Sequence, residues 1–418
     1  MRKREVWGWA MYDFANSGYT TVVITAVFNA YFVAQVAGNA SWATLAWTLA
    51  LAVSYAAVIV TAPVIGAYAD AHAAKKRLLL ATTVGCVLST AALGAVGPGD
   101  LALGIMLIVV SNYFFSTGEN LVAAFLPELA HGEAMGRVSG WGWSLGYLGG
   151  LVTLGVCLSY VTWAQGQGVP AARFVPITML VTAGIFALAS VPTFALLRER
   201  ALPAAGPHTA RSAFARLKTT WRRAGHYADL RRVLVCITCY QAGIQTVVAL
   251  AAVYAQQVMG FTLRDSMVLI MLVNVAAGVG AFLFGQVQDR LGHVRTLVIT
   301  LAGWLTAIVL VALAHSVAVF WIAAHLVGLC LGASQSAGRA LVGYLSPPAR
   351  TAEFFGLWGL AVKLASILGP VSYGLVTWMS GGSHRLAIVI TGLFFVGGLA
   401  LLRAVDVKRG RTAALAAD

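Results

Sequence analysis

The chain has 418 residues, of which 60% are hydrophobic and only 10% are charged, and its mean hydropathy is +0.83. This composition leaves too little polar surface to cover a water-soluble globule, so the sequence predicts an integral membrane protein. The net charge of +14 would also fit a nucleic-acid binder, and the placement of the basic residues decides between the two.

The basic residues are divided unevenly between the two sides of the membrane. Of the 28 Lys and Arg residues, 23 fall on the side that would hold both termini, three on the other side (Arg173, Arg264 and Arg385) and two within apolar runs (Arg339 and Lys363). This asymmetry predicts that both termini lie in the cytoplasm. We expect the multi-pass protein in a bacterial inner membrane. A basic inner face next to anionic lipid accounts for the charge, so we expect no nucleic-acid partner.

The cysteines give no sign of a disulfide framework or a metal site. They are odd in number, and all lie in apolar runs: Cys86, Cys157, Cys236, Cys239 and Cys330. Two of them, Cys236 and Cys239, form a CxxC, but it lies inside a helix without a nearby His or carboxylate, so we expect no metal and no cofactor. We also expect no cleavable signal peptide, because Asp13 and Asn16 interrupt the first apolar run, which is too long for one.

Twelve apolar runs are long enough to cross a membrane. The predicted spans are 7–36, 43–69, 78–97, 101–126, 138–163, 174–197, 232–258, 266–288, 294–314, 317–343, 353–379 and 385–405. The connections are short, except for the basic stretch 198–231, which we interpret as a cytoplasmic linker. The predicted fold is therefore all-α, with twelve transmembrane helices in two six-helix lobes, 1–197 and 232–418.

The first span opens with a stretch from Trp9 to Tyr19 that carries a carboxylate at Asp13. A charge inside a membrane helix costs several kcal/mol unless it faces a protein-lined cavity or a partner, so Asp13 marks a candidate site. The polar residues that share its helical face are Asn16, Ser17, Thr20 and Thr21. We expect this face, with Tyr12 beside it, to line a central cavity.

A short motif occurs in both halves, 219 residues apart, at the predicted cytoplasmic ends of spans 2 and 8. Each copy has a Gly, an Asp four residues later and a basic cluster. The residues are Gly66, Asp70, Lys75, Lys76 and Arg77 in the first copy, and Gly285, Asp289, Arg290 and Arg295 in the second. We interpret them as a latch that joins neighbouring helix ends by breakable ion pairs; the alternative is an ordinary solvated loop.

This motif on a frame of six plus six spans resembles the major facilitator superfamily over the whole chain. Three segments further resemble the branch of autophagy-related vacuolar amino-acid effluxers and their bacterial relatives: 9–19 with YDFANS, 120–129 with LPEL, and 139–150, rich in Gly and Trp. The resemblance implies a rocking transporter of amino acids or similar small solutes, directed outward and proton-linked in some members. The glycines of span 5 also resemble the superfamily's antiporter motif. Tyr147 stands where that motif has a Pro, and this difference weakens the suggestion that the protein is an antiporter.

Four ionisable residues lie within predicted spans, eight to ten residues from the cytoplasmic helix ends: Asp13, Glu119, Arg339 and Lys363. That spacing corresponds to a common depth of roughly 12–15 Å, so we expect one layer in which two acids face two bases. The alternatives are local roles. Asp13 would cap the helix or extend its carboxylate to the nearby inner membrane surface. Glu119 would form a structural ion pair with Arg339, and Lys363 would connect the two lobes.

Polar side chains accompany these charges on spans 4, 7 and 10, and we expect them to bind substrate or, alternatively, to bond helix to helix. They are Asn112, Asn120, Gln241, Gln245 and Gln335. In the expected mechanism a zwitterionic solute places its carboxylate on Arg339 or Lys363 and its ammonium near Asp13 or Glu119. Protonation of Asp13 or Glu119 would remove one partner of the solute and allow the two lobes to move. These two residues are therefore the proton-coupling candidates.

The predicted function is secondary active transport of a small zwitterionic solute by rocker-switch alternating access, proton-coupled and outward, by a monomer in the lipid bilayer. The alternative is an anionic or phosphorylated solute, or a lysolipid, held by Arg339 and Lys363. An enzyme is disfavoured, because the GxSxG at 142–146 lies on a predicted helix where Gly142, Gly146 and Gly150 repeat every fourth residue and form a close-packing face. A channel is disfavoured too. Channels usually form their pore between symmetric subunits, which would not require an internal repeat of six plus six spans.

Overall fold

The computed structural model describes residues 3–129, 134–200, 227–314, 316–346 and 351–416. In this part of the chain the regular structure is helical and contains no strand. Twelve of the described helices are long and apolar enough to cross a membrane, and they start and end within a few residues of the predicted spans. The predicted all-α fold with twelve transmembrane helices is confirmed, and the chain is an integral, multi-pass membrane protein.

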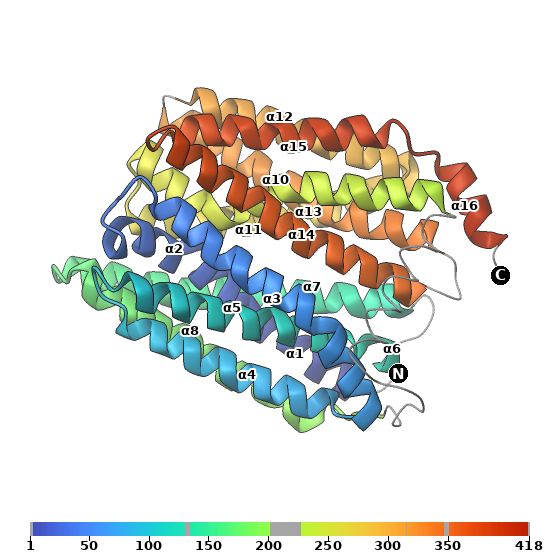
Figure 1. Ribbon diagram of the computed structural model, residues 1–418, viewed down its shortest axis with the longest axis horizontal. Coiled ribbons are helices and arrows are strands. Elements are labelled where there is room, and N and C mark those ends of the chain that lie inside the picture. Colours follow the sequence, from blue (N-terminus) through green and yellow to red (C-terminus); the bar gives the residue numbers. More distant parts are fainter. Residues whose placement is uncertain (1–2, 130–133, 201–226, 315, 347–350, 417–418) are drawn as a thin grey trace. The chain divides into compact units, whose positions relative to one another are not determined.

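The first of two compact units comprises residues 1–214, 251–256 and 260–271. Its helices run side by side and are coloured blue to green in Figure 1. They are α1 (Lys3–Tyr19), α2 (Phe28–Tyr31), α3 (Ala43–His72), α4 (Lys75–Ala92), α5 (Leu101–Ala123), α6 (Leu126–Leu129), α7 (Ala134–Gly166) and α8 (Ala171–Leu196). Helix α1 packs against α7 and α8, while α5 packs against α3 and α4.

The second unit comprises residues 215–250, 257–259 and 272–418. It takes most of α10 (Ala228–Met259) and α11 (Leu263–Leu291), which also contribute residues to the first unit. The other helices are α12 (His293–Leu313), α13 (Val317–Leu345), α14 (Thr351–Met379), α15 (His384–Leu402) and the short C-terminal α16 (Val407–Leu415). Helix α12 packs between α13 and α15, and α16 packs on α13.

The first span is less regular than the sequence predicts. After α1 the chain forms a π-helix, η1 (Thr20–Ala26), then α2, then a second π-helix, η2 (Phe32–Val36). The Val27 N–H donates to the Val22 carbonyl five residues earlier, at 2.9 Å. Local sequence favours this loosening, because η1 is almost wholly β-branched and the Thr21 hydroxyl donates to the Ser17 carbonyl at 2.9 Å. A π-turn in a helix often marks a functional position.

Helices α1 and α7 approach closely along a row of glycines. The Phe14 carbonyl oxygen occupies the space that a Cβ of Gly149 would need, and Ser17 Oγ and Thr21 Oγ1 lie against Gly146 and Gly150. The prediction that the glycines of 142–150 form a close-packing helical face is confirmed. Part of the α1 polar face therefore packs against α7, where the sequence predicted a cavity surface for all of it.

Candidate functional site

The two acids of the predicted centre lie in the first unit, on α1 and α5. The side chains of Asp13 and Glu119 are both half-buried. The Asp13 carboxylate packs against Gly142 of α7, with an oxygen where a Cβ at that position would stand. The backbone carbonyl of Asp13 accepts a hydrogen bond from Ser17 Oγ at 2.7 Å. The position of this carboxylate inside the spanning helix is therefore set in part by its contact with α7.

Three other predicted substrate-binding residues of this unit are buried among helices. Tyr12 is 1% exposed and its hydroxyl lies 3.0 Å from Thr83 Oγ1. Asn112 is fully buried, and its amide donates to Ser54 Oγ on α3 at 3.0 Å. Asn16 is 6% exposed. For Asn112 the observed contact is the helix-to-helix bond that the sequence left open as the alternative.

In the second unit, two of the predicted glutamines contact each other. Gln241 Nε2 of α10 donates to Gln335 Oε1 of α13 at 2.6 Å. Gln241 is 1% exposed, and its own carbonyl oxygen has no hydrogen-bond partner among the described residues. Gln245, one turn further along α10, is half-buried. The amide pair thus joins α10 to α13 and leaves one strong acceptor for another donor.

The two bases of the predicted centre also belong to the second unit. The Arg339 guanidinium of α13 lies 5.4 Å from the ring centroid of Trp358 on α14, a cation–π distance. Lys363, also on α14, is half-buried. The indole ring packs against one face of the guanidinium, and the N–H donors of a guanidinium lie in its own plane, at its edge. The layer expected to join these bases to Asp13 and Glu119 stays a prediction.

The first copy of the repeated motif takes part in a network at one end of the first unit. Lys75 Nζ forms an ion pair with Glu128 Oε1 at 3.0 Å, which ties the start of α4 to α6. The Glu199 carboxylate accepts the backbone N–H groups of Lys75 and Lys76 at 2.7 and 3.1 Å, as an anion at a helix N-terminus does. Arg200 pairs with Glu5. The predicted latch residue Lys75 therefore joins helix ends within its own unit.

The remaining latch candidates are less informative. Arg77 and Arg295 are exposed. The structure does not describe the side chains of Asp70, Asp289 and Arg290 or the surroundings of Gly285. The latch role of the second copy stays a prediction.

A charged cluster that the sequence analysis missed lies in the second unit, where α16 docks. Asp229, at the start of α10, is 2% exposed and accepts two hydrogen bonds from Arg409 of α16, at 2.7 and 2.6 Å, and one from Arg232 at 3.1 Å. The hydrogen bonds to Asp229 raise the pKa of the Arg409 guanidinium. Arg411 stacks on Tyr344 of α13. The sequence signal was the basic run of residues 408–411 after the last span.

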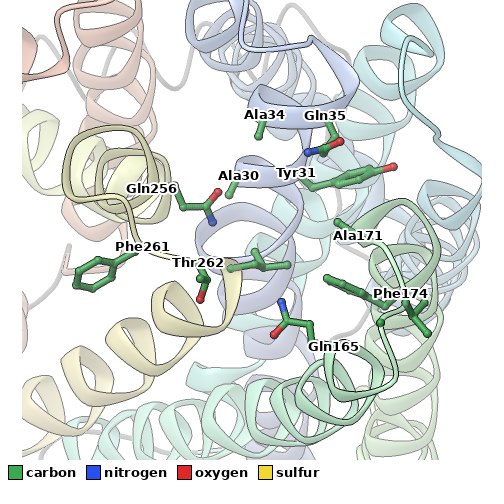
Figure 2. A pocket seen from close by; sticks show the side chains of 13 residues that line it. Ala30, Tyr31, Ala34, Gln35, Gln165, Ala171, Phe174, Gln256, Phe261 and Thr262 are labelled. Carbon is green, nitrogen blue, oxygen red and sulfur yellow. The ribbon is translucent and has the colours of Figure 1, made fainter.

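The first unit contains a cavity of about 470 Å³ near the end of the first span, shown in Figure 2. Three glutamines from different segments line it: Gln35 of η2, Gln165 at the end of α7 and Gln256 of α10. The amides of Gln165 and Gln256 point toward the space between them. Tyr31 also lines it, with its hydroxyl donating to the Val96 carbonyl at 3.3 Å. Among the described residues that line this cavity none is charged, so it suits a neutral polar group.

A second cavity of about 170 Å³ lies between α3 and α5, and we call it the α3–α5 pocket. Its apolar walls come from small and aliphatic side chains. Its polar lining comes from Lys75 and Asn120, which the sequence analysis named as candidates, and from Thr117, which it did not. The lining residues are Ala62, Ile65, Gly66, Ala69, Lys75, Thr117, Asn120, Leu121 and Ala124. The pocket thus brings Asn120, expected to bind substrate, together with the latch residues Gly66 and Lys75.

Comparison with known proteins decides the family. A family model described as "Vacuole effluxer Atg22 like" matches residues 33–415. The chain belongs to the Atg22-like family. This Atg22-like chain is 26% identical to an uncharacterized MFS-type transporter, YxiO, of Bacillus subtilis, over 93% of the chain and 92% of that protein. It is 28% identical to autophagy-related protein 22-1 of Aspergillus fumigatus over 67% of the chain, but that match spans only 49% of the fungal protein.

Solved structures agree with this assignment at the level of the fold. The Atg22-like chain superposes on the nucleoside transporter NupG with a TM-score of 0.69 and 13% identity, covering 97% and 99% of the two chains. It superposes on the inward-open xylose transporter XylE from E. coli with a TM-score of 0.68 and 14% identity, covering 95% of each. The chain is a transporter of the major facilitator type and not an enzyme, as the sequence predicted.

Proposed function

We propose that this Atg22-like chain is a secondary active transporter that moves a small zwitterionic solute, an amino acid or a similar molecule, by rocker-switch alternating access. The observation that carries the proposal is the set of four ionisable side chains inside spanning helices of a transporter: Asp13, Glu119, Arg339 and Lys363. Charges inside membrane helices are rare and are associated with substrate and ion routes. The description of the family as effluxers supports export as the direction.

The balance of these charges favours a zwitterion over an ion of one sign. The first unit supplies two acids and the second supplies two bases. A solute with both a carboxylate and an ammonium group can satisfy Arg339 or Lys363 and also Asp13 or Glu119, so no ion stays uncompensated away from water. The guanidinium of Arg339, positioned over Trp358, is suited to a planar carboxylate, which it can bind through two N–H groups.

Proton coupling is assigned to the acids. Arginine keeps its proton at any ordinary pH, whereas a carboxylate exchanges one with water in the accessible range. Protonation of Glu119 or Asp13 would remove one partner of the bound ammonium and thereby change which state the solute stabilises. We further propose that the protein works as a monomer with both termini in the cytoplasm of a bacterial cell, in line with the basic residues on that side.

The test is transport into liposomes that contain the purified protein, with an imposed pH gradient and a panel of labelled amino acids. We expect flux above that of empty vesicles for at least one amino acid, driven by the gradient. Glu119→Gln should lose the dependence of transport on pH. Asp265→Asn, which alters an exposed carboxylate at the start of α11, is the matched control and should behave like the wild type.

Two outcomes would count against the proposal. An unchanged pH dependence in Glu119→Gln would remove Glu119 from the proton route. Absence of flux for every amino acid would favour the alternative, an anionic or phosphorylated solute or a lysolipid held by Arg339 and Lys363. The same liposomes with labelled phosphorylated solutes and lysolipids would then identify the class.

A further inference from the structure

The larger cavity of the first unit, shown in Figure 2, is lined by three glutamine side chains, and we call it the glutamine cavity. Gln35 comes from η2, Gln165 from the last turn of α7 and Gln256 from the last turn of α10. A primary amide has two N–H donors and an acceptor oxygen, so each of these side chains can both donate and accept. A ligand that suits them carries groups that also do both, distributed around its perimeter.

The protein itself makes little use of these amides. Gln256 Nε2 donates to Ser266 Oγ at 3.3 Å, and Ser266 Oγ donates to the Thr262 carbonyl at 3.0 Å. The side chain of Gln256 is half-buried, so α11 fixes its position. Gln35 and Gln165 are exposed, and no described residue forms a hydrogen bond with either amide. Both of these amides therefore keep their donors and acceptor for a ligand or for water.

The helix ends that carry two of the amides have a fixed geometry. Helix α7 ends before Gly168, which has φ 71°, and the Val169 N–H donates to the Ala164 carbonyl at 3.0 Å. Helix α10 ends before Gly260, which has φ 68°. Glycine adopts this left-handed conformation at little cost, so both helix ends close with a defined turn. The glutamine cavity is therefore largely preformed, as sites for small molecules usually are.

The π-helices of the first span determine which side chains reach the cavity. A π-turn holds one residue more than an α-turn, and this residue rotates the helix that follows by about 100°. The lining residues that follow η1 are Ala30, Tyr31, Ala34 and Gln35, at the spacing of one helical face. The irregular part of the first span thus turns Gln35 toward the glutamine cavity.

Two aromatic rings form the buried side of the cavity. Phe174 of α8 is 2% exposed, and Figure 2 shows its ring pointing into the cavity. Tyr31 is 3% exposed, and its hydroxyl donates to the Val96 carbonyl at 3.3 Å. That bond occupies the polar end of Tyr31, so the ring is the part that lines the cavity. Aromatic rings on one side and amides on the others suit a ligand with an apolar face and polar edges.

Charge and size restrict the ligand further. Among the described lining residues none is charged, so nothing would offset the desolvation of a charged ligand. The volume of about 470 Å³ lies within the roughly 300–1,000 Å³ of small-molecule sites and corresponds to about 16 waters, enough for a hexose and several ordered waters. A hexose has hydroxyl groups all around its ring, and each both donates and accepts. A planar aromatic amide has its polar groups at one edge only.

We propose that the glutamine cavity binds a neutral monosaccharide. The hydroxyl groups of the sugar bond to the amides of Gln35, Gln165 and Gln256, and a C–H face of its ring packs on Phe174 and Tyr31. This inference goes beyond the proposed function, because the site is separate from the four ionisable residues and does not require that the sugar be transported. A bound sugar would link the end of the first span to the ends of α7 and α10.

The test is binding of D-glucose to the purified full-length protein, measured by saturation-transfer difference NMR in nanodiscs prepared without sugar-based detergents. Gln165→Leu removes one amide, and we expect it to weaken binding about three- to tenfold, as for one hydrogen bond. Ala171→Phe fills part of the cavity and should abolish binding. Gln167→Leu and Ala172→Phe are the matched controls, because these two residues are close in the chain but do not line the cavity.

Competition defines the ligand class. Other neutral hexoses should displace glucose, whereas glucuronate and 6-amino-6-deoxyglucose, which are charged at pH 7, should compete at least about tenfold less well. Cyclohexanol, which has the ring without most of the hydroxyl groups, and nicotinamide, a planar aromatic amide, should also compete poorly. Equal competition by both charged sugars would overturn the assignment of a neutral ligand. Equal competition by cyclohexanol or nicotinamide would overturn the assignment of a sugar.

The variants also decide whether the site itself is correct. Wild-type affinity in both Gln165→Leu and Ala171→Phe would overturn the site. A wild type that binds no neutral hexose would overturn it too, and would mean a cavity filled by water only.

Variants of the transport centre separate this proposal from the proposed function. Asp13→Asn and Arg339→Ala should leave glucose binding unchanged. Binding that is lost in those two variants and unchanged in Gln165→Leu would place the sugar at the transport centre and contradict the glutamine cavity. A protein that transports no amino acid but binds glucose in a Gln165-dependent way would leave this inference standing and remove the proposed function.

Discussion

The hydroxyl of Tyr12 lies directly over Gly118, so that a Cβ added to Gly118 would come within 2.5 Å of the phenolic oxygen. The same relationship occurs in the second unit, where the Tyr240 hydroxyl lies over Gly338. Tyr240 follows Tyr12 by 228 residues, and Gly338 follows Gly118 by 220. The internal repeat therefore extends beyond the charged motif to the packing of the first helix of each half on the fourth.

This packing predicts that Gly118→Ala is destabilising. Tyr12 is 1% exposed and bonded to Thr83, so its ring cannot move aside without breaking that bond. We expect a loss of about 1–3 kcal/mol, as for other overpacked cores, seen as a lower thermal unfolding midpoint in detergent. Gly338→Ala should behave alike. The control is Gly184→Ala on α8, where an added Cβ meets nothing within 4 Å, and equal stability of the control and Gly118→Ala would contradict the packing argument.

The spans were predictable because membrane helices have a strong, local signal. A run such as that of α13 needs about 20 apolar residues whatever lies beside it, and its predicted bounds of 317–343 compare with Val317–Leu345 in the structure. The π-helices of the first span were not predictable from hydropathy. They depend on backbone hydrogen bonding, in which Val27 bonds to Val22, and on close contact with α7. Apolarity alone cannot distinguish a π-helix from an α-helix.

The candidate site was harder to predict, because it depends on which helix each face meets. The sequence places Asn112 and Gln241 on polar stripes but does not show which residues they contact, because Ser54 and Gln335 lie 58 and 94 residues away in the chain. Thr117 had no visible signal, since a threonine in a membrane helix usually bonds to its own backbone. Only the three-dimensional contacts show that its hydroxyl lacks a partner among the described residues.

The left-handed backbone conformation of Ala73 predicts that its substitution by glycine is stabilising. It follows α3 with φ 46° and ψ 52°, in the left-handed region, where a Cβ costs about 1–2 kcal/mol relative to a relaxed backbone. The corresponding position of the second half, 219 residues later, is Gly292, which also has a positive φ of 82°. We expect Ala73→Gly to raise the unfolding midpoint by the equivalent of about 1 kcal/mol. Ala74→Gly, at φ −116°, should give no gain, and a gain in both variants would argue against relief at position 73.

The docking of α16 predicts that Arg409→Ala releases the C-terminal helix. Arg409 supplies two of the hydrogen bonds to buried Asp229, whose carboxylate also accepts the backbone N–H of Asp406 at 3.0 Å. The nine residues of α16 are too few to be a stable helix alone, and the contact of Arg411 with Tyr344 would have to hold the helix without the two hydrogen bonds of Arg409. Amide hydrogen exchange across 407–415 should become faster in Arg409→Ala. Lys408→Ala, on the exposed side of the same helix, should leave the exchange unchanged.

The distribution of basic residues predicts the orientation in the membrane. With 23 of 28 Lys and Arg on one side, both termini should lie in the cytoplasm. Fusion of green fluorescent protein to the C-terminus should give fluorescent bacterial cells, and fusion of alkaline phosphatase there should be inactive. The connection between α7 and α8, near Gln167, should give the opposite result with an inserted phosphatase. Active phosphatase at the C-terminus would show that the orientation is reversed.

The contact between Asp13 and Gly142 gives a test of the role of Asp13 that leaves the acid in place. A methyl group at Gly142 would occupy the position of an Asp13 carboxylate oxygen and would also come within 2.9 Å of the Trp9 ring, so Gly142→Ala should displace both side chains without removing the charge of Asp13. If Asp13 binds substrate or carries the proton, misplacing it should lower the transport rate by about tenfold to a hundredfold. In an Asp13→Ala background the same substitution should cause a much smaller further loss, because only the contact with Trp9 then remains to be disturbed. Additive losses in the double variant would mean that Gly142→Ala acts by general disturbance of the α1–α7 contact, and Gly146→Ala, which meets Ser17 instead, measures the size of that effect.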